Sequence, residues 1–176
     1  MTPPLCTERL YLRNVVPQDQ LKVFEGLSHP EVIKHYGVSY ATFEATAAQM
    51  EWYQTQQDNR SGYFWVLEQA TSGQFMGIAG IYFINWQHRS GELGYWLLPE
   101  FWNQGYATEA LDAILKHMQT EVKLHRIAAE IETANTTSVQ LLKRLGFSYE
   151  GTKVDVEIKD GKYISLSLWA KIFPEN

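Results

Sequence analysis

The turn from Phe101 to Tyr106, which contains Gly105, is the stretch whose residue types most clearly suggest chemistry. It follows a short aromatic and apolar run, Glu92 to Leu98, of the kind that forms a strand. After the turn, apolar residues recur every three or four positions from Ala107 to Met118, as on one buried face of a helix. A glycine turn between a strand and a helix leaves backbone N–H groups free at the positive end of the helix dipole. We therefore predict an anion site here, best suited to a phosphate.

Two common nucleotide-binding motifs are missing from this turn. No Gly-Lys-Ser/Thr follows it, as a Walker motif requires, and it contains no G-x-G-x-x-G dinucleotide fingerprint. Nucleotide hydrolysis and hydride transfer therefore lose support. Glu109 falls in the first helical turn, where a carboxylate interacts favourably with the helix dipole, and we interpret it as a helix-start residue.

A second segment, ANTTSVQLLKRLGF at 134–147, follows the predicted helix after one more strand. Together with GYW at 94–96 and GYATEA at 105–110, its Asn135, Ser138 and Gly146 resemble the motifs of the GNAT superfamily of N-acetyltransferases. The opening TERLYLR at 7–13 and the closing hairpin are similar to the RimJ/RimL branch, which acetylates the N-termini of ribosomal proteins. The resemblance covers nearly the whole chain.

This resemblance implies acetyl-coenzyme A as the acyl donor. In the family, backbone amides of the turn hold the pyrophosphate, and the edge of the preceding strand pairs with the pantetheine amides. Trp102 stands where the family usually has Gln or Arg, a change that leaves the backbone cradle intact. The residues implied in cofactor binding are Leu97, Leu98, Asn103, Gln104, Gly105, Tyr106, Ala107, Thr108 and Asn135.

Transfer of an acyl group to an amine needs a neutral amine, a stabilised oxyanion and a proton for the leaving thiolate. In the family the amine attacks the thioester directly, and a backbone N–H near Leu97 would hold the oxyanion. Many relatives use a tyrosine as the acid at the position of Leu142, whereas the branch uses a serine that matches Ser138. Ser138 is equally well explained as the third residue of a helix capped by Asn135.

Two glutamates are candidates for the general base. Glu92 lies on the central predicted strand and could act through a water, while Glu157, near the tip of the last hairpin, aligns with a base proposed in the branch. Either could be an ordinary solvated carboxylate. We favour Glu92 because it shares the cofactor strand, where burial would raise its pKa.

The amine acceptor stays open at this point. It is either the N-terminal amine of a protein or a small amine, and Ser165 replaces an aspartate that the branch often has. Trp52, Tyr36, Trp86 and Tyr106 are aromatic candidates for the acceptor wall. A module that binds acyl-coenzyme A without turnover is the alternative of a different class. No metal site is predicted, because the five histidines are scattered without zinc-ligand spacing.

The elements that must position these residues alternate between strands and helices. Strands are predicted at 10–15, 63–69, 74–85, 92–98, 126–132, 149–158 and 163–172, with helices after Pro17, near 30–37, at 43–57, 107–118 and 135–145. This order predicts one domain over residues 1–176 of the mixed α+β class. About seven strands would form a mostly antiparallel twisted sheet with helices on both faces. The resemblance implies that this sheet is splayed at the cofactor slot.

Composition and charge set further limits. The 176 residues carry 15 Lys and Arg against 20 Asp and Glu, and a net charge of −5 gives no general attraction for nucleic acid or an anionic membrane. The single cysteine, Cys6, fits a reducing compartment. The start, Met1-Thr2-Pro3-Pro4, does not look like a signal peptide, and the longest apolar run, 78–84, is too short to span a bilayer. We expect a soluble cytoplasmic protein that is a monomer or a homodimer.

Overall fold

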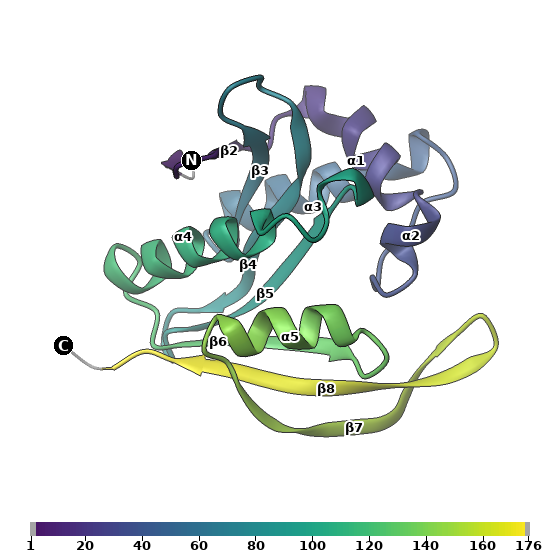
Figure 1. The fold of residues 1–176 in the computed structure, drawn as a ribbon, viewed down its shortest axis with the longest axis vertical. Helices are drawn as coiled ribbons and strands as arrows, with labels where there is room; N and C mark the ends of the chain where they lie inside the picture. Colours follow the sequence, from purple (N-terminus) through teal and green to yellow (C-terminus); the bar gives the residue numbers. More distant parts are fainter. Residues whose placement is uncertain (1–2, 175–176) are drawn as a thin grey trace.

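Strand segments form one sheet of eight strands in the computed structural model, which describes residues 3–174 (Figure 1). Met1 and Thr2, part of the segment examined for a signal peptide, lie outside the described residues. The strands are β1 (Leu5–Cys6), β2 (Leu10–Asn14), β3 (Tyr63–Gln69), β4 (Phe75–Asn85), β5 (Ser90–Leu97), β6 (Arg126–Glu132), β7 (Ser148–Lys159) and β8 (Lys162–Ile172). The helices are α1 (Gln20–Leu27), α2 (Pro30–Ile33), α3 (Ala47–Asp58), α4 (Tyr106–Thr120) and α5 (Thr136–Arg144), with 3-10 turns η1 (Pro17–Asp19), η2 (Glu44–Thr46) and η3 (Pro99–Phe101).

The sheet is mixed and mostly antiparallel, as predicted. Its strand order is β1-β2-β3-β4-β5-β6-β8-β7, and only β5 and β6 run parallel. The sheet has one strand more than the seven predicted, because β1 has only two residues and no sequence pattern indicates it. The helix α4 connects β5 to β6, as a parallel pair requires.

The two parallel strands separate soon after they begin. Backbone pairing between β5 and β6 joins Ser90–Glu92 to Arg126–Ala128 and goes no further, although both strands continue for several residues. The splayed sheet predicted from the sequence is therefore confirmed. The inner edges of β5 and β6 beyond this point border a slot in the sheet.

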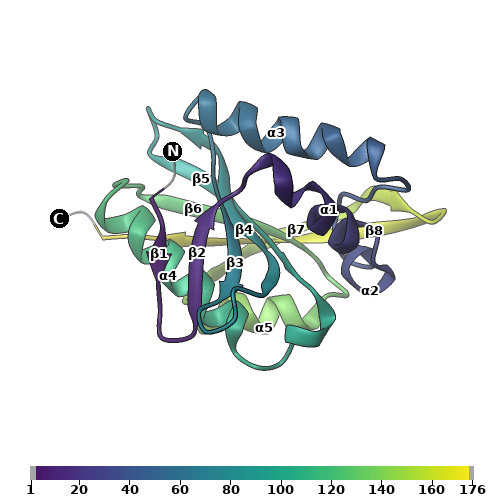
Figure 2. The ribbon, with the colours of Figure 1, turned by 90° about the horizontal axis from the view of Figure 1, so that it is seen from above.

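Helices cover both faces of the sheet (Figure 2). Buried residues of α4 and α5 pack with Leu93 and Leu97 of β5 in one apolar cluster. Residues of α1, α2 and α3 pack with Trp96 of the same strand in a second cluster. Because neighbouring residues of a strand point to opposite faces, Tyr95 shares the α4–α5 face and Glu92 lies on the α3 face.

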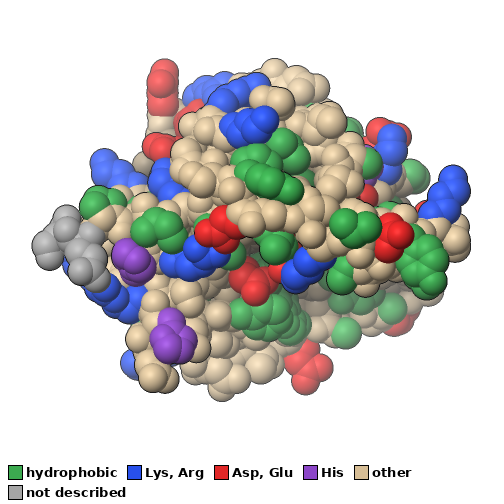
Figure 3. All heavy atoms as spheres, turned by 90° about the horizontal axis from the view of Figure 1, so that it is seen from below, with side chains coloured by type: hydrophobic (Ala, Val, Ile, Leu, Met, Phe, Trp, Pro, Cys, Tyr) green, Lys and Arg blue, Asp and Glu red, His purple; other side chains and the backbone are tan. Residues whose placement is uncertain are grey.

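The hairpin of β7 and β8 forms the edge of the sheet opposite β1. Figure 3 shows one face of the molecular surface. Acidic, basic and apolar side chains are interspersed on that surface. Val154, Ile158 and Tyr163 of the hairpin are among the most exposed large apolar side chains. None of the described helices has the length and apolar character needed to cross a membrane.

Candidate active site

The turn between β5 and α4 folds into a cradle of backbone N–H groups. Asn103 has a φ of 58° and Gly105 a φ of 83°, and left-handed residues at this spacing turn successive N–H groups toward one side. The first helical hydrogen bond of α4 runs from Glu109 N to Gly105 O at 3.0 Å. The N–H groups of 106–108 therefore lack partners within the helix, and no side chain caps them at Gly105. This arrangement suits a phosphate.

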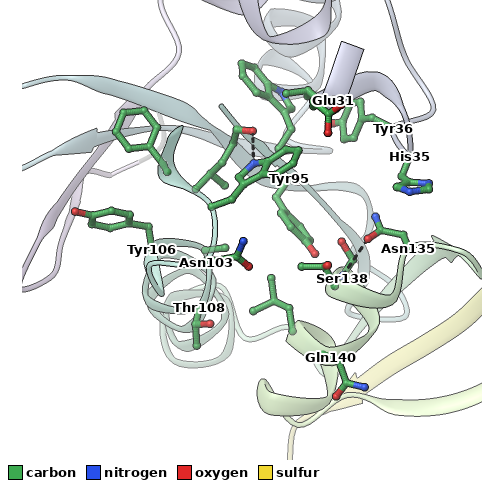
Figure 4. Close-up of a pocket in the computed structure, with 18 of the residues that line it drawn as sticks. Glu31, His35, Tyr36, Tyr95, Asn103, Tyr106, Thr108, Asn135, Ser138 and Gln140 are labelled. Carbon is green, nitrogen blue, oxygen red and sulfur yellow. Dashed lines mark hydrogen bonds between the residues drawn. The ribbon is translucent and has the colours of Figure 1, made fainter. Parts of the chain in front are cut away.

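A pocket of about 650 Å³ opens beside this cradle (Figure 4). It runs between β5 and α5, and two exposed cations, Lys34 and Arg144, are part of its lining. Neither cation was predicted, because nothing in the sequence separates them from other surface basic residues. Of the residues expected at the cofactor, those that line the pocket are Leu97, Asn103, Gly105, Tyr106, Ala107, Thr108 and Asn135.

The other two residues expected at the cofactor, Leu98 and Gln104, do not line this pocket. The Leu98 N–H donates to Met76 O at 2.8 Å, on the side of the strand that faces β4. The Gln104 carbonyl accepts from Arg9 Nη1 at 3.0 Å. These backbone groups are therefore already engaged, and Gln104 supports the cradle from its outer side.

Trp102 takes part in the architecture of the turn. Its indole Nε1 donates to the carbonyl of Leu97 at 2.8 Å, which ties the turn to the end of β5 (Figure 4). Because the N–H and C=O of a strand residue point to the same edge, the Leu97 N–H faces the slot as well. That geometry agrees with the oxyanion role expected for this group.

Glu109 does more than begin the helix. Its Oε1 accepts from Thr7 Oγ1 at 2.5 Å and from Arg9 N at 2.9 Å, and its Oε2 accepts from Arg9 Nε at 2.6 Å. Arg9 also lies over the Tyr106 ring at 4.3 Å. The segment before β2 is thereby fixed against the back of the cradle. Burial opposes the ionisation of Glu109, but the hydrogen bonds from Thr7 and Arg9 outweigh it and lower the pKa of the carboxyl.

Replacing Glu109 by glutamine is expected to weaken coenzyme A binding about tenfold, since the charged hydrogen bonds that hold Arg9 and the turn are lost.

The lowered pKa of Glu109 also predicts how the stability of the fold depends on pH. The ionised carboxylate stabilises the fold above the usual glutamate pKa of about 4.3, and that contribution is lost as the pH falls through the lowered value. Urea unfolding at neutral and acidic pH should therefore show a smaller acid loss in Glu109→Gln. Glu51→Gln, at an exposed position of α3, is the matched control and should behave as wild type in both measurements.

The helix α5 begins as the sequence indicates. The side chain of Asn135 accepts from Ser138 N at 3.1 Å, so Asn135 is its N-cap. Gly146, with a φ of 80°, follows the helix in the left-handed conformation expected of a C-terminal glycine. Ser138 contributes its backbone N–H to the cap, and its side chain lines the pocket, where its hydroxyl lies beside Tyr95.

Tyr95 belongs to the GYW motif at 94–96, but the sequence assigned it no role of its own. Its side chain leaves β5 within the slot and points toward Ser138 (Figure 4). Burial raises the pKa of Tyr95 to about 12, while the Ser138 hydroxyl beside it acts in the opposite direction. The sequence signals were its place in that motif and its position three residues after Glu92 on the strand expected to carry the cofactor.

A second pocket, of about 620 Å³, opens on the side of the sheet covered by α3. Trp52 and Tyr36 line it, as proposed for an acceptor wall, but Tyr106 lines the first pocket instead. Trp86 lines neither: it is exposed and donates to Arg60 O at 2.9 Å. Further aromatic rings around this pocket come from Tyr40, Tyr82 and Phe83.

Four carboxylates also line the second pocket, and two of them are already paired. Glu130 contacts Lys153 Nζ at 2.6 Å, and Glu132 contacts Lys159 Nζ at 2.7 Å and His35 Nδ1 at 2.8 Å. Neither Glu92 nor Glu157 has an ion pair or side-chain hydrogen bond within residues 3–174. These two carboxylates are therefore available to an incoming amine.

The two free carboxylates differ in their surroundings. Glu92 is half-buried, and burial together with the nearby Glu130 carboxylate raises its pKa, against a smaller lowering by Lys153. Glu157 is exposed and lies beside a register shift of the β7–β8 hairpin. The environment of Glu92 is the one expected of a general base.

The two pockets share residues at the place where β5 and β6 separate. Tyr95, Ser138 and Asn135 line both pockets, as do His35 and Tyr36. An anion cradle on one face of the sheet thus connects through the slot to a carboxylate-containing pocket on the other. The fold and the site together are suited to a class of protein that binds a phosphate-bearing molecule at the cradle and a second molecule in the carboxylate-containing pocket.

The comparisons with known proteins agree with this class. The family model described as the acetyltransferase (GNAT) domain matches residues 9–148. A relative described as the uncharacterized N-acetyltransferase YoaA of Bacillus subtilis is 27% identical over 175 residues, which cover 99% of each chain. The ribosomal-protein-serine acetyltransferase of Escherichia coli is 28% identical over 99 residues, or 56% of this chain and 55% of that protein.

The same fold occurs in the crystal structure of spermidine N-acetyltransferase from Vibrio cholerae in complex with CoA and spermine, with a TM-score of 0.84 and 22% identity over 94% of this chain and 96% of that one. This chain belongs to the GNAT acetyltransferase family. It is an acetyl-coenzyme A-dependent N-acetyltransferase.

Proposed function

We propose that the chain moves the acetyl group of acetyl-coenzyme A to a primary amine by direct attack in a ternary complex. The observation that carries this proposal is the junction of the two pockets at Tyr95 and Ser138. The donor would lie with its diphosphate on the backbone N–H groups of 103–107 and its acetyl end at the junction. The acceptor would reach the same point from the pocket that contains Glu92.

Three side chains and one backbone N–H group would each take part in the transfer. Glu92 removes a proton from the amine through a water, which its raised pKa favours. The backbone N–H of Leu97 faces the slot and would hold the oxyanion. Ser138 and Tyr95 present hydroxyls to the leaving sulfur. No covalent intermediate on the enzyme is needed, because the amine itself is the nucleophile.

Two classes of acceptor are supported by different observations. The N-terminal amine of a protein is supported by the ribosomal-protein acetyltransferase among the relatives. A small cationic amine is supported by the free carboxylates and aromatic rings of the second pocket, which attract and enclose a positive charge. A cytoplasmic site of action belongs to the same proposal and is supported by the single cysteine and by the ribosomal-protein relative.

Release of coenzyme A thiol tests the proposal. The protein is incubated with acetyl-coenzyme A and, in separate reactions, with peptides bearing free N-termini, with polyamines and with amino acids. Amine-dependent thiol release and a labelled product are expected with one class. Saturable binding of acetyl-coenzyme A without thiol release in any reaction would favour a non-catalytic acyl-coenzyme A module instead.

Ser138→Ala separates the two explanations of this serine. If its hydroxyl assists the leaving sulfur, kcat should fall about tenfold, the worth of one hydrogen bond. The unfolding midpoint should stay unchanged, because alanine keeps the backbone N–H that Asn135 caps. Asn135→Ala removes the cap and should cost about 1 kcal/mol of stability. An unchanged kcat in Ser138→Ala would mean that Ser138 serves only as a residue of the first turn of α5.

A further inference from the structure

Two buried side-chain atoms within residues 3–174 make no hydrogen bond of ordinary length and angle: the hydroxyl of Tyr95, which has the Ser138 hydroxyl beside it, and the indole nitrogen of Trp96. A buried hydroxyl without a partner destabilises a fold and is rare in native structures. Trp96 packs in the apolar cluster with residues of α1, α2 and α3, and it lines the first pocket but not the second. Tyr95 is different, because its side chain points toward Ser138 (Figure 4) and both residues line both pockets.

The ring of Tyr95 is held in place by its surroundings. It packs against the apolar cluster formed with α4 and α5, and its backbone belongs to the central strand. The side chain is thus held in place before any ligand binds. Such a donor loses little freedom when a ligand arrives, which is what a stabiliser of developing charge needs.

We propose that the Tyr95 hydroxyl donates a hydrogen bond to the thioester sulfur and stabilises the negative charge that forms there when the carbon–sulfur bond breaks. This inference rests on the proposed function and adds to it a residue to which the sequence assigned no part in catalysis. Ser138, beside the hydroxyl, is then a positioning residue for Tyr95 as well as a neighbour of the sulfur.

The pKa of Tyr95 decides between donation of a hydrogen bond and transfer of a proton. At about 12 the phenol stays protonated at neutral pH. An ordinary thiol of the cysteine type has a pKa of about 8.5, so full transfer from tyrosine to thiolate is unfavourable. The phenol therefore keeps its proton and stabilises the sulfur by the hydrogen bond alone.

The step balances without a further reactant. The amine nitrogen gives its electron pair to the carbonyl carbon, and a carbon–nitrogen bond forms. The tetrahedral intermediate then collapses, and the pair of the carbon–sulfur bond leaves on sulfur. The proton lost by nitrogen passes through water to Glu92 and is released to solvent, from which the thiolate is later protonated.

Tyr95→Phe removes the hydroxyl and keeps the ring. It is expected to lower kcat about 10²-fold, the loss seen when one preorganised donor is removed from a developing charge. The KM for the amine should change less than about threefold, since the hydroxyl acts on the leaving group. Tyr11→Phe, which removes an exposed hydroxyl from β2, is the matched control and should keep wild-type kcat.

Ligand binding gives a second measurement that needs no acceptor. Coenzyme A and desulfo-coenzyme A differ only at the sulfur, so their dissociation constants report the contact with Tyr95. Wild type should bind coenzyme A about tenfold more tightly than the desulfo form, and Tyr95→Phe should lose most of this preference, since only the Ser138 hydroxyl would remain near the sulfur. The ultraviolet absorbance of the thiolate should also show a lower thiol pKa for bound coenzyme A in wild type than in Tyr95→Phe.

The outcomes separate this inference from the proposed function. Turnover by wild type with an unchanged kcat in Tyr95→Phe would overturn the role of Tyr95 and leave the acetyltransferase proposal standing. No turnover with any amine, together with a sulfur preference that depends on Tyr95, would support the contact while the acceptor proposal fails. Equal binding of both ligands by wild type would overturn the contact itself.

Discussion

Glu92→Gln is expected to lower kcat by about 10²–10⁴-fold, the contribution of a positioned general base. The substitution keeps the size of the side chain and its place on β5, so loss of activity would report loss of the proton acceptor. The pH dependence should change with it. Because the pKa of Glu92 is raised, kcat/KM of wild type should increase with pH, with an inflection above the ordinary range of glutamate pKa values. This increase on the acidic side of the pH profile, the acidic limb, should be missing in Glu92→Gln.

Glu157→Gln is the matched comparison, with the same substitution in the same pocket. Since Glu157 is exposed and lies on the hairpin, its loss should mainly raise the KM for a cationic amine, by about threefold to tenfold, and leave the pH limb in place. A large fall of kcat in Glu157→Gln with little change in Glu92→Gln would assign the base to the hairpin.

Gly105→Val should weaken coenzyme A binding about 10²-fold. The φ of 83° at this position is unfavourable for a side chain, and an added Cβ would lie 3.3 Å from Arg9 Nη2. The turn must then rearrange, and loss of about two charged hydrogen bonds to the diphosphate amounts to roughly 3 kcal/mol. The dissociation constant, measured from the ligand-dependent rise in melting temperature, gives the result.

A control for backbone strain is available in the same chain. Gly73, in the turn between β3 and β4, has a φ of 68° and open space around it. Gly73→Val should lower the melting temperature through the same left-handed strain and leave coenzyme A affinity unchanged. Equal affinity losses in both variants would show that general destabilisation, and not the cradle, explains the Gly105 result.

Much of the fold could be predicted because its signals are local. The strand Arg126–Glu132, the cap at Asn135 and the closing hairpin each follow from alternation, a capping side chain or a glycine turn within a few residues. The splayed sheet was expected from the family resemblance and is confirmed by the short pairing of β5 with β6. The two-residue strand β1 escaped prediction because it forms only by pairing with β2.

The site was predictable where the backbone does the binding and less so where side chains meet across the fold. The cradle at Gly105 follows from one glycine before a helix. The Trp102 bond to Leu97, the Arg9 contact with Glu109 and the approach of Tyr95 to Ser138 join residues of different elements. Such contacts depend on the three-dimensional arrangement, so no spacing within one segment could indicate them.

A crystal structure with coenzyme A and an unreactive amine is the most direct test that the two pockets meet at one reaction centre. It should show the diphosphate on the backbone N–H groups of 103–107, the sulfur beside Tyr95 and Ser138, and the amine approaching from Glu92. A diphosphate bound elsewhere, or an amine separated from the sulfur by the sheet, would contradict the account.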